Sequence, residues 1–139
     1  MGRFERFEDM AVWREARGLV RDVYQLANIG GFARDFGLRD QLRRSAVSIM
    51  SCVAEGFERG GDRDFRRFLR MAKGSAGEVR LLLYVAGDVG YLDAARRDRL
   101  NDSVAGISRQ LGGMIKYLSG SIRAEETRPP AKRKAERGR

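Results

Sequence analysis

Apolar residues recur at steps of three and four positions along four stretches of the chain, which is the spacing of one buried helix face. The four stretches cover about residues 9–28, 35–57, 62–89 and 93–122. In the last stretch the apolar positions from Leu100 to Ile122 come close to a coiled-coil seam. No proline precedes Pro129, so long helices are permitted. The pattern therefore predicts four helices, with Asp62 as a good N-cap for the third.

The connections between the predicted helices are short and lie at Gly30–Gly31, Gly60–Gly61 and Gly90–Leu92. Short connections make consecutive helices antiparallel neighbours. We therefore expect an all-α fold, an antiparallel up-down-up-down four-helix bundle, over residues 1–122. Residues 123–139 have no apolar face, contain both prolines and carry seven basic residues against three acidic ones, which predicts a disordered basic tail.

Glycine and other small residues inside the predicted helices indicate how two of them meet. Gly74, Ser75 and Gly77 form a thin patch on the third helix. Small residues also recur on the second helix, at Ser45, Ser48, Ser51 and Cys52. A glycine in a helix costs up to ~1 kcal/mol relative to alanine, and this cost is usually accepted where another backbone comes close. We expect close packing of the second and third helices, and poor local helix stability is the alternative.

The charge balance points to an anionic partner. The chain has 28 Lys and Arg residues against 19 Asp and Glu residues, for a net charge of +9, and 24 of the basic residues are arginine. Arginine matches phosphate in two-point geometry, so this balance suits polyanions. A GC-rich genome would explain the preference for arginine over lysine, but it would not explain the excess of positive charge.

The residue types present also exclude several kinds of chemistry. The chain has no histidine, and its one cysteine, Cys52, excludes an internal disulfide and a multi-cysteine zinc site. The sequence contains no dinucleotide or Walker glycine loop. We therefore expect no enzymatic activity, no metal and no cofactor. The N-terminus has no apolar signal core and no apolar run reaches membrane length, so a cytoplasmic protein is expected.

The third predicted helix carries the clearest candidate binding surface. Its arginines cluster on one side, Lys73 extends that side, and no carboxylate occurs between Phe65 and Gly77. A solvated helix face usually mixes both signs of charge, so three explanations stay open: a plain solvated face, a nucleic-acid site or a site for an acidic protein. The candidate nucleic-acid-binding residues are Arg39, Arg43, Arg63, Arg66, Arg67, Arg70 and Lys73, together with Lys132, Arg133 and Lys134 of the tail.

Two carboxylates of the second and third helices are candidates for structural ion pairs. If the chain turns at Gly60–Gly61, each carboxylate lies level with arginines of the facing helix. The expected pairs are Glu78 with Arg43 or Arg44, and Glu55 with Arg66 or Arg67. Both pairs would be partly buried and would fix the register of the hairpin.

Several segments resemble one bacterial protein family. The opening Phe7–Trp13, the central Phe36–Ile49 and the following Ser51–Gly56 are similar to its signature, and the likeness spans about residues 4–118. The family is that of the bacterial four-helix bundle proteins first noticed as open reading frames in intervening sequences of large-subunit ribosomal RNA genes. Cys52 stands where this family usually has asparagine, and the tail is not part of the family pattern.

This resemblance implies a four-helix bundle that forms a homo-oligomer, with a ring-like pentamer favoured. A distant relative by fold is the accessory protein of diversity-generating retroelements, a basic pentamer that binds a reverse transcriptase and nucleic acid. The leading hypothesis is a non-enzymatic oligomeric bundle that binds RNA or DNA through an arginine-rich surface with little sequence specificity. The alternative is a protein-interaction scaffold or an accessory subunit, for example of a reverse transcriptase.

Overall fold

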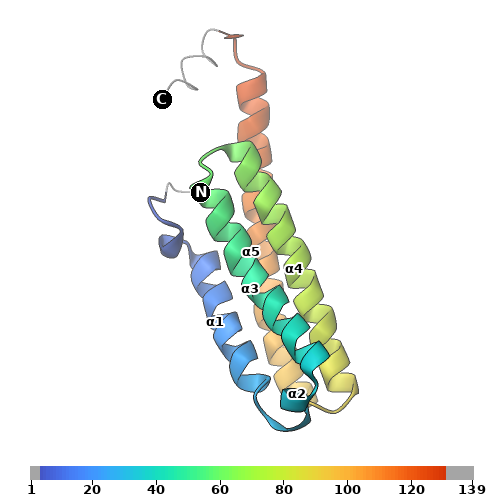
Figure 1. Cartoon of the computed structure of the whole chain (residues 1–139). Coiled ribbons are helices and arrows are strands. Elements are labelled where there is room, and N and C mark those ends of the chain that lie inside the picture. Colours follow the sequence, from blue (N-terminus) through green and yellow to red (C-terminus); the bar gives the residue numbers. More distant parts are fainter. Residues whose placement is uncertain (1–3, 131–139) are drawn as a thin grey trace.

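The fold is described by a computed structural model that covers residues 4–130, and it is built from helices that mostly run along one long axis (Figure 1). A short 3-10 helix, η1, spans Phe7–Asp9. The α-helices are α1 (Ala11–Leu26), α2 (Gly30–Arg34), α3 (Phe36–Glu58), α4 (Asp62–Asp88) and α5 (Ala94–Glu126). No strand occurs in the described part of the chain. The predicted all-α class is therefore confirmed.

The four long helices alternate in direction and form the predicted bundle. Helix α1 packs against α3 and α5, and α4 packs against the same two helices, so α1 and α4 lie diagonally across the bundle. The predicted seam on the last helix is confirmed from Val104 to Ile122, where its apolar side chains are buried, while Leu100 at its start is half-buried. The buried side chains are Val104, Ile107, Leu111, Met114, Leu118 and Ile122. Each outer surface of the bundle is thus made by one helix or by two neighbouring helices.

Aspartates end two of the connections as N-caps. The carboxylate of Asp35 accepts a hydrogen bond from the amide of Leu38 at 3.1 Å, and that of Asp93 accepts one from the amide of Arg96 at 2.8 Å. Asp35 also accepts a hydrogen bond of 2.9 Å from the hydroxyl of Tyr91, and this bond raises the pKa of Tyr91. The two connections at this end of the bundle are therefore tied to each other.

The prediction that Asp62 caps the third helix was wrong, because the N-cap of α4 is Gly61. Asp62 is the first helical residue, where its charge is favourable near the helix N-terminus. Its carboxylate accepts a hydrogen bond of 2.9 Å from the hydroxyl of Ser121 on α5. The aspartate therefore joins two helices instead of ending one.

Two helix boundaries also differ from the prediction. Gly30 adopts a φ of 57°, which suits glycine, and the chain at once enters the short helix α2, where Phe32 is fully buried. Helix α5 continues past residue 122 to Glu126, and its last turns project beyond the α3–α4 connection (Figure 1). The predicted tail therefore begins with a helical turn, and residues 131–139 lie outside the described residues.

The close approach of α3 and α4 occurs at a different glycine from the ones predicted. A Cβ atom added at Gly56 would lie 2.6 Å from the Cβ of Phe68, so only glycine fits there without a shift. Gly74 and Gly77 have no atom within 4 Å of such a Cβ and face outward. The predicted glycine patch on α4 was wrong, whereas Ser75 does reach α3 by a hydrogen bond of 3.0 Å to Ser48.

No helix within residues 4–130 is long and apolar enough to cross a membrane.

Candidate nucleic-acid interface

The basic side chains of α4 lie beside α5, and two contacts fix how the helices are aligned. The guanidinium of Arg66 donates a hydrogen bond of 3.3 Å to the hydroxyl of Ser119. The Cε atom of Lys73 lies 3.6 Å from where a Cβ would stand at Gly112. The stretch of α4 from Arg66 to Lys73 therefore runs antiparallel beside residues 112–119 of α5.

Both of these neighbouring stretches lack carboxylates. No Asp or Glu occurs between Phe65 and Gly77 on α4, and none occurs between Ser103 and Ala124 on α5. On α5 this stretch carries Arg109, Lys116 and, in the last turn of the helix, Arg123, which follow each other at steps of seven residues and therefore share one side of the helix. We call the combined surface the α4–α5 basic face and define it as Arg66, Arg70, Lys73, Arg109 and Lys116.

The charges of the α4–α5 basic face are not neutralised within the chain. Arg70, Lys73, Arg109 and Lys116 are exposed, and Arg66 is half-buried. In the part of the chain that the structure describes, none of these five groups has a carboxylate oxygen within 4.0 Å. The face therefore presents positive charge that an external anion can meet.

The other two predicted arginines of α4, Arg63 and Arg67, form ion pairs within the chain. Arg63 forms an ion pair of 2.5 Å with Glu126, and the hydrogen bond to this carboxylate raises the pKa of Arg63. Arg67 lies 3.4 Å from Asp64 and stacks 4.7 Å above the ring of Phe68. With Arg66, Arg70 and Met71 these side chains line a shallow groove. Arg63 and Arg67 thus border the face, but a nearby carboxylate partly neutralises the charge of each.

Arg39 and Arg43 lie near the opposite end of the bundle and contact protein atoms. Arg39 donates hydrogen bonds of 3.0 Å to the carboxylate of Asp40 and to the carbonyl oxygen of Ala33. Arg43 donates one of 3.0 Å to the side-chain oxygen of Asn28 and lies 4.7 Å above the ring of Tyr24. The structure therefore does not bring them together with the arginines of α4. Lys132, Arg133 and Lys134 lie outside the described residues.

Comparison with known proteins identifies the family of this chain. Residues 8–113 match the family described as 23S rRNA-intervening sequence protein. The chain belongs to this family. The bundle of this chain is also similar to the crystal structure of a protein of unknown function from the S23 ribosomal protein family of Bacteroides thetaiotaomicron. The two share 20% identity with a TM-score of 0.71, and the match covers 76% of this chain and 95% of that chain.

None of the curated proteins compared matches this chain. The family match confirms the resemblance stated from Phe7–Trp13 and Phe36–Ile49, and the similar crystal structure supports the fold. The distant likeness to the retroelement accessory protein stays a prediction. The family match ends at residue 113, so Lys116 of the α4–α5 basic face lies beyond it.

Neither predicted ion pair occurs among residues 4–130. Glu55 pairs with Arg59 on its own helix at 3.2 Å, and Glu78 accepts a hydrogen bond of 3.0 Å from the side-chain amide of Gln41. The expected register was correct to within about a turn, because Gln41 and Ser48 do face Glu78 and Ser75. Arg43 contacts Asn28, Arg44 is exposed with no ion pair among residues 4–130, and Arg66 turns toward α5. The predicted pairs of Glu78 with Arg43 or Arg44, and of Glu55 with Arg66 or Arg67, were therefore wrong.

Sequence reasoning also missed two residues of the face, Arg109 and Lys116. Their signal was present, because Ser103–Ala124 is the longest stretch of the chain without a carboxylate. The missing information was that this stretch lies beside the basic side of α4.

Cys52 is buried, and its sulfur lies 3.8 Å from the hydroxyl of Ser48. No group of three or more His, Cys, Asp or Glu residues that could hold a metal ion occurs within residues 4–130.

Proposed function

We propose that this protein binds the phosphate backbone of nucleic acid through the α4–α5 basic face, with little readout of base sequence. The observation that supports this proposal most is the run of five cations on two adjacent helix stretches that contain no carboxylate. Like charges on one helix repel each other, so such a face is stabilised when an anion binds to it. Nucleic acid supplies anions at regular spacing along a surface of this length.

The dimensions of the face suit a phosphate backbone. Arg66 and Lys73 are seven residues apart, which corresponds to about 10 Å along a helix. A duplex carries one phosphate for every ~1.7 Å of its axis, so several phosphates lie within reach of the five side chains. The sequence contains no zinc-finger spacing and no aromatic ribonucleoprotein signature. Backbone contacts of this kind position a protein on nucleic acid but do not select a sequence.

Measuring affinity against salt tests the proposal directly. Fluorescence anisotropy with labelled RNA and DNA of unrelated sequences should give similar affinities at each salt concentration. With five phosphate contacts, the logarithm of the binding constant should fall with the logarithm of salt concentration at a slope of about −4 to −5. A flat salt response, or no binding at about 50 mM salt, would contradict the proposal.

The C-terminal half of α4 supports a second proposal, self-association. Beyond Gly77 the outward side of this helix turns apolar, with Leu81 52% exposed, Val85 40% and Val89 54%. Neighbouring apolar side chains left in water mark surfaces that bind other proteins. We propose that a second copy of the chain covers this half of α4, in agreement with the oligomer that the family resemblance implies.

Light scattering checks this second proposal. The wild-type protein should show a mass of several 15.7 kDa chains. Replacing Leu81 and Val85 with aspartate should reduce the mass toward that of one chain, because two charges would then be desolvated in the interface. Arg80→Asp adds an acidic residue on the same helix and should leave the mass unchanged. A wild-type monomer would contradict self-association and leave this surface to another protein, such as a reverse transcriptase.

A further inference from the structure

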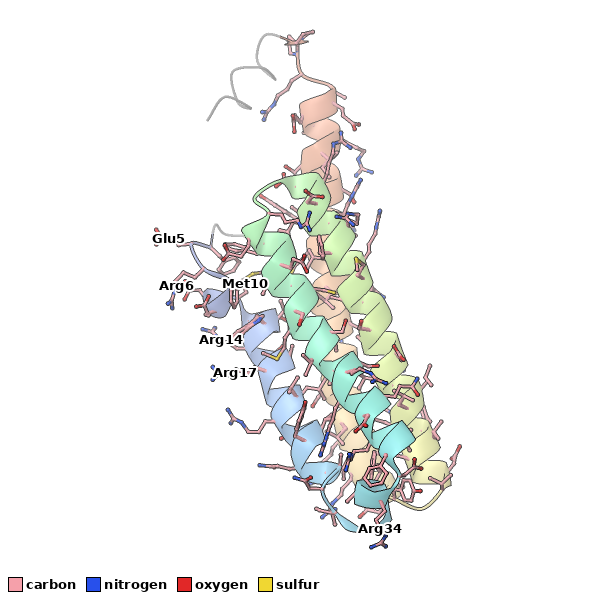
Figure 2. All side chains as sticks on the ribbon, viewed as in Figure 1. Glu5, Arg6, Met10, Arg14, Arg17 and Arg34 are labelled. Atoms are coloured by element: carbon pink, nitrogen blue, oxygen red, sulfur yellow. The ribbon has the colours of Figure 1, made fainter. Side chains whose placement is uncertain are left out.

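Helix α1 carries a second arginine cluster that the candidate site does not include. Arg14, Arg17 and Arg21 follow each other at steps of three and four residues, so they share one side of the helix. All three are exposed, and this side is opposite the buried residues of α1. Arg14 and Arg17 point away from the bundle in Figure 2. We call these three residues the α1 arginine ridge.

The carboxylates of α1 lie toward α5 and away from the ridge. The carboxylate of Glu15 accepts a hydrogen bond from the side-chain amide of Gln110. Asp22 lines a groove between the two helices together with Arg96 and Arg99 of α5. Among the described residues, no arginine of the ridge has a carboxylate oxygen within 4.0 Å. The ridge therefore has a single sign of charge, like the α4–α5 basic face.

The ridge and the α4–α5 basic face point in different directions. Helix α1 lies diagonally opposite α4, so the outward side of α1 faces away from the outward side of α4. One straight segment of nucleic acid on the α4–α5 basic face would therefore not reach the ridge.

We propose that the α1 arginine ridge is a second contact surface for the phosphate backbone, so that the protein holds two segments of nucleic acid at once. Arg14 and Arg21 are about 10 Å apart along the helix, and phosphates of one strand follow each other every ~3.4 Å of axis. The three arginines thus match a short run of phosphates. Arg17 also lies 5.8 Å from the ring centre of Trp13, which restricts its side chain on the helix surface. This inference rests on the proposed function and extends it to bridging.

A capture assay tests bridging. A biotinylated DNA duplex is fixed on beads, a fluorescent duplex of unrelated sequence is kept in solution, and the wild-type protein should retain the fluorescent duplex on the beads. The variant R14Q/R17Q/R21Q should retain at least about 10-fold less, while its affinity for one duplex in solution changes less than about 3-fold, because the α4–α5 basic face is intact. The variant R14K/R17K/R21K keeps the charge and should still bridge.

A matched control removes three charges elsewhere. The variant R34Q/R96Q/R99Q alters exposed arginines at the other end of the bundle, where Figure 2 shows Arg34, and should bridge like the wild type. The inference is overturned if R14Q/R17Q/R21Q bridges normally, which would also mean that copies of the α4–α5 basic face suffice in an oligomer. It is also overturned if the wild type binds single duplexes but never bridges them, an outcome that leaves the proposed function standing. Absence of any duplex binding would overturn both.

Discussion

Replacing Arg66, Arg70, Lys73 and Lys116 with glutamine is expected to lower the affinity for nucleic acid on the order of 100-fold at low salt. These side chains supply four of the five cations of the α4–α5 basic face. Each phosphate contact releases counterions, and its loss should reduce the steepness of the salt dependence by about 0.9. Anisotropy titrations at several salt concentrations should therefore show a slope that is about 3 to 4 units shallower than that of the wild type.

The control variant has the same net charge as the first variant, but its four substitutions lie outside the α4–α5 basic face. Glutamine at Arg34, Arg44, Arg96 and Arg99 removes four exposed arginines that lie outside the face. This variant should lose no more than about 3-fold in affinity, because it retains every proposed contact. If both variants lose the same affinity, the net charge of the protein governs binding and the face has no special role. Circular dichroism of both variants verifies that the bundle is intact.

Gly56→Ala is expected to lower the free energy of unfolding by about 2–3 kcal/mol. The added methyl group would lie 2.6 Å from the Cβ of Phe68 and 3.2 Å from a ring carbon of Phe65. A Cβ atom cannot rotate away from its backbone, so α3 and α4 would have to separate at this position. Phe68 is only 6% exposed, and Arg59 and Arg67 stack on its ring, so the surroundings have little room to adjust.

Gly74→Ala is the matched control, and it should have the opposite sign. No atom lies within 4 Å of the added methyl group, and Gly74 is an exposed position inside α4. Alanine is preferred over glycine in a helix by up to ~1 kcal/mol, so this variant should become more stable. Denaturant unfolding followed by circular dichroism measures both changes. A neutral Gly56→Ala would show that the two helices are further apart than the structure indicates.

The fold was predictable from the sequence because the buried face of a helix repeats every three to four residues regardless of its neighbours. Helix α2 escaped prediction because Gly30 both ends one helix and precedes the next, and the burial of Phe32 is a tertiary effect. The prediction from the glycines of α4 was wrong for a related reason. Composition shows that Gly74 and Gly77 leave room, but it does not show whether another helix fills that room.

The candidate site was predictable only one helix at a time. The acid-free basic side of α4 was visible in the sequence, as was the longer acid-free stretch of α5. Their union depends on which side of each helix faces the other, and small changes of helix rotation decide that. The same uncertainty explains the wrong ion pairs, because the level of Arg66 along the bundle was nearly right while its direction was not. Arg39 and Arg43 lie apart from this face, and their partners Ala33 and Asn28 in the connection before α3 could not be inferred from helix periodicity.

The diagonal placement of α1 and α4 has a consequence for how this protein can change. Each of these helices packs against α3 and α5, so the interior of the bundle separates their outer sides. Substitutions at distant sites have independent effects, so a substitution at Arg70 should lower the affinity for a duplex by the same factor whether or not Arg14 is also replaced. Natural selection could then raise, lower or abolish the affinity of one outer side without changing that of the other. The packing of the interior would remain as it is.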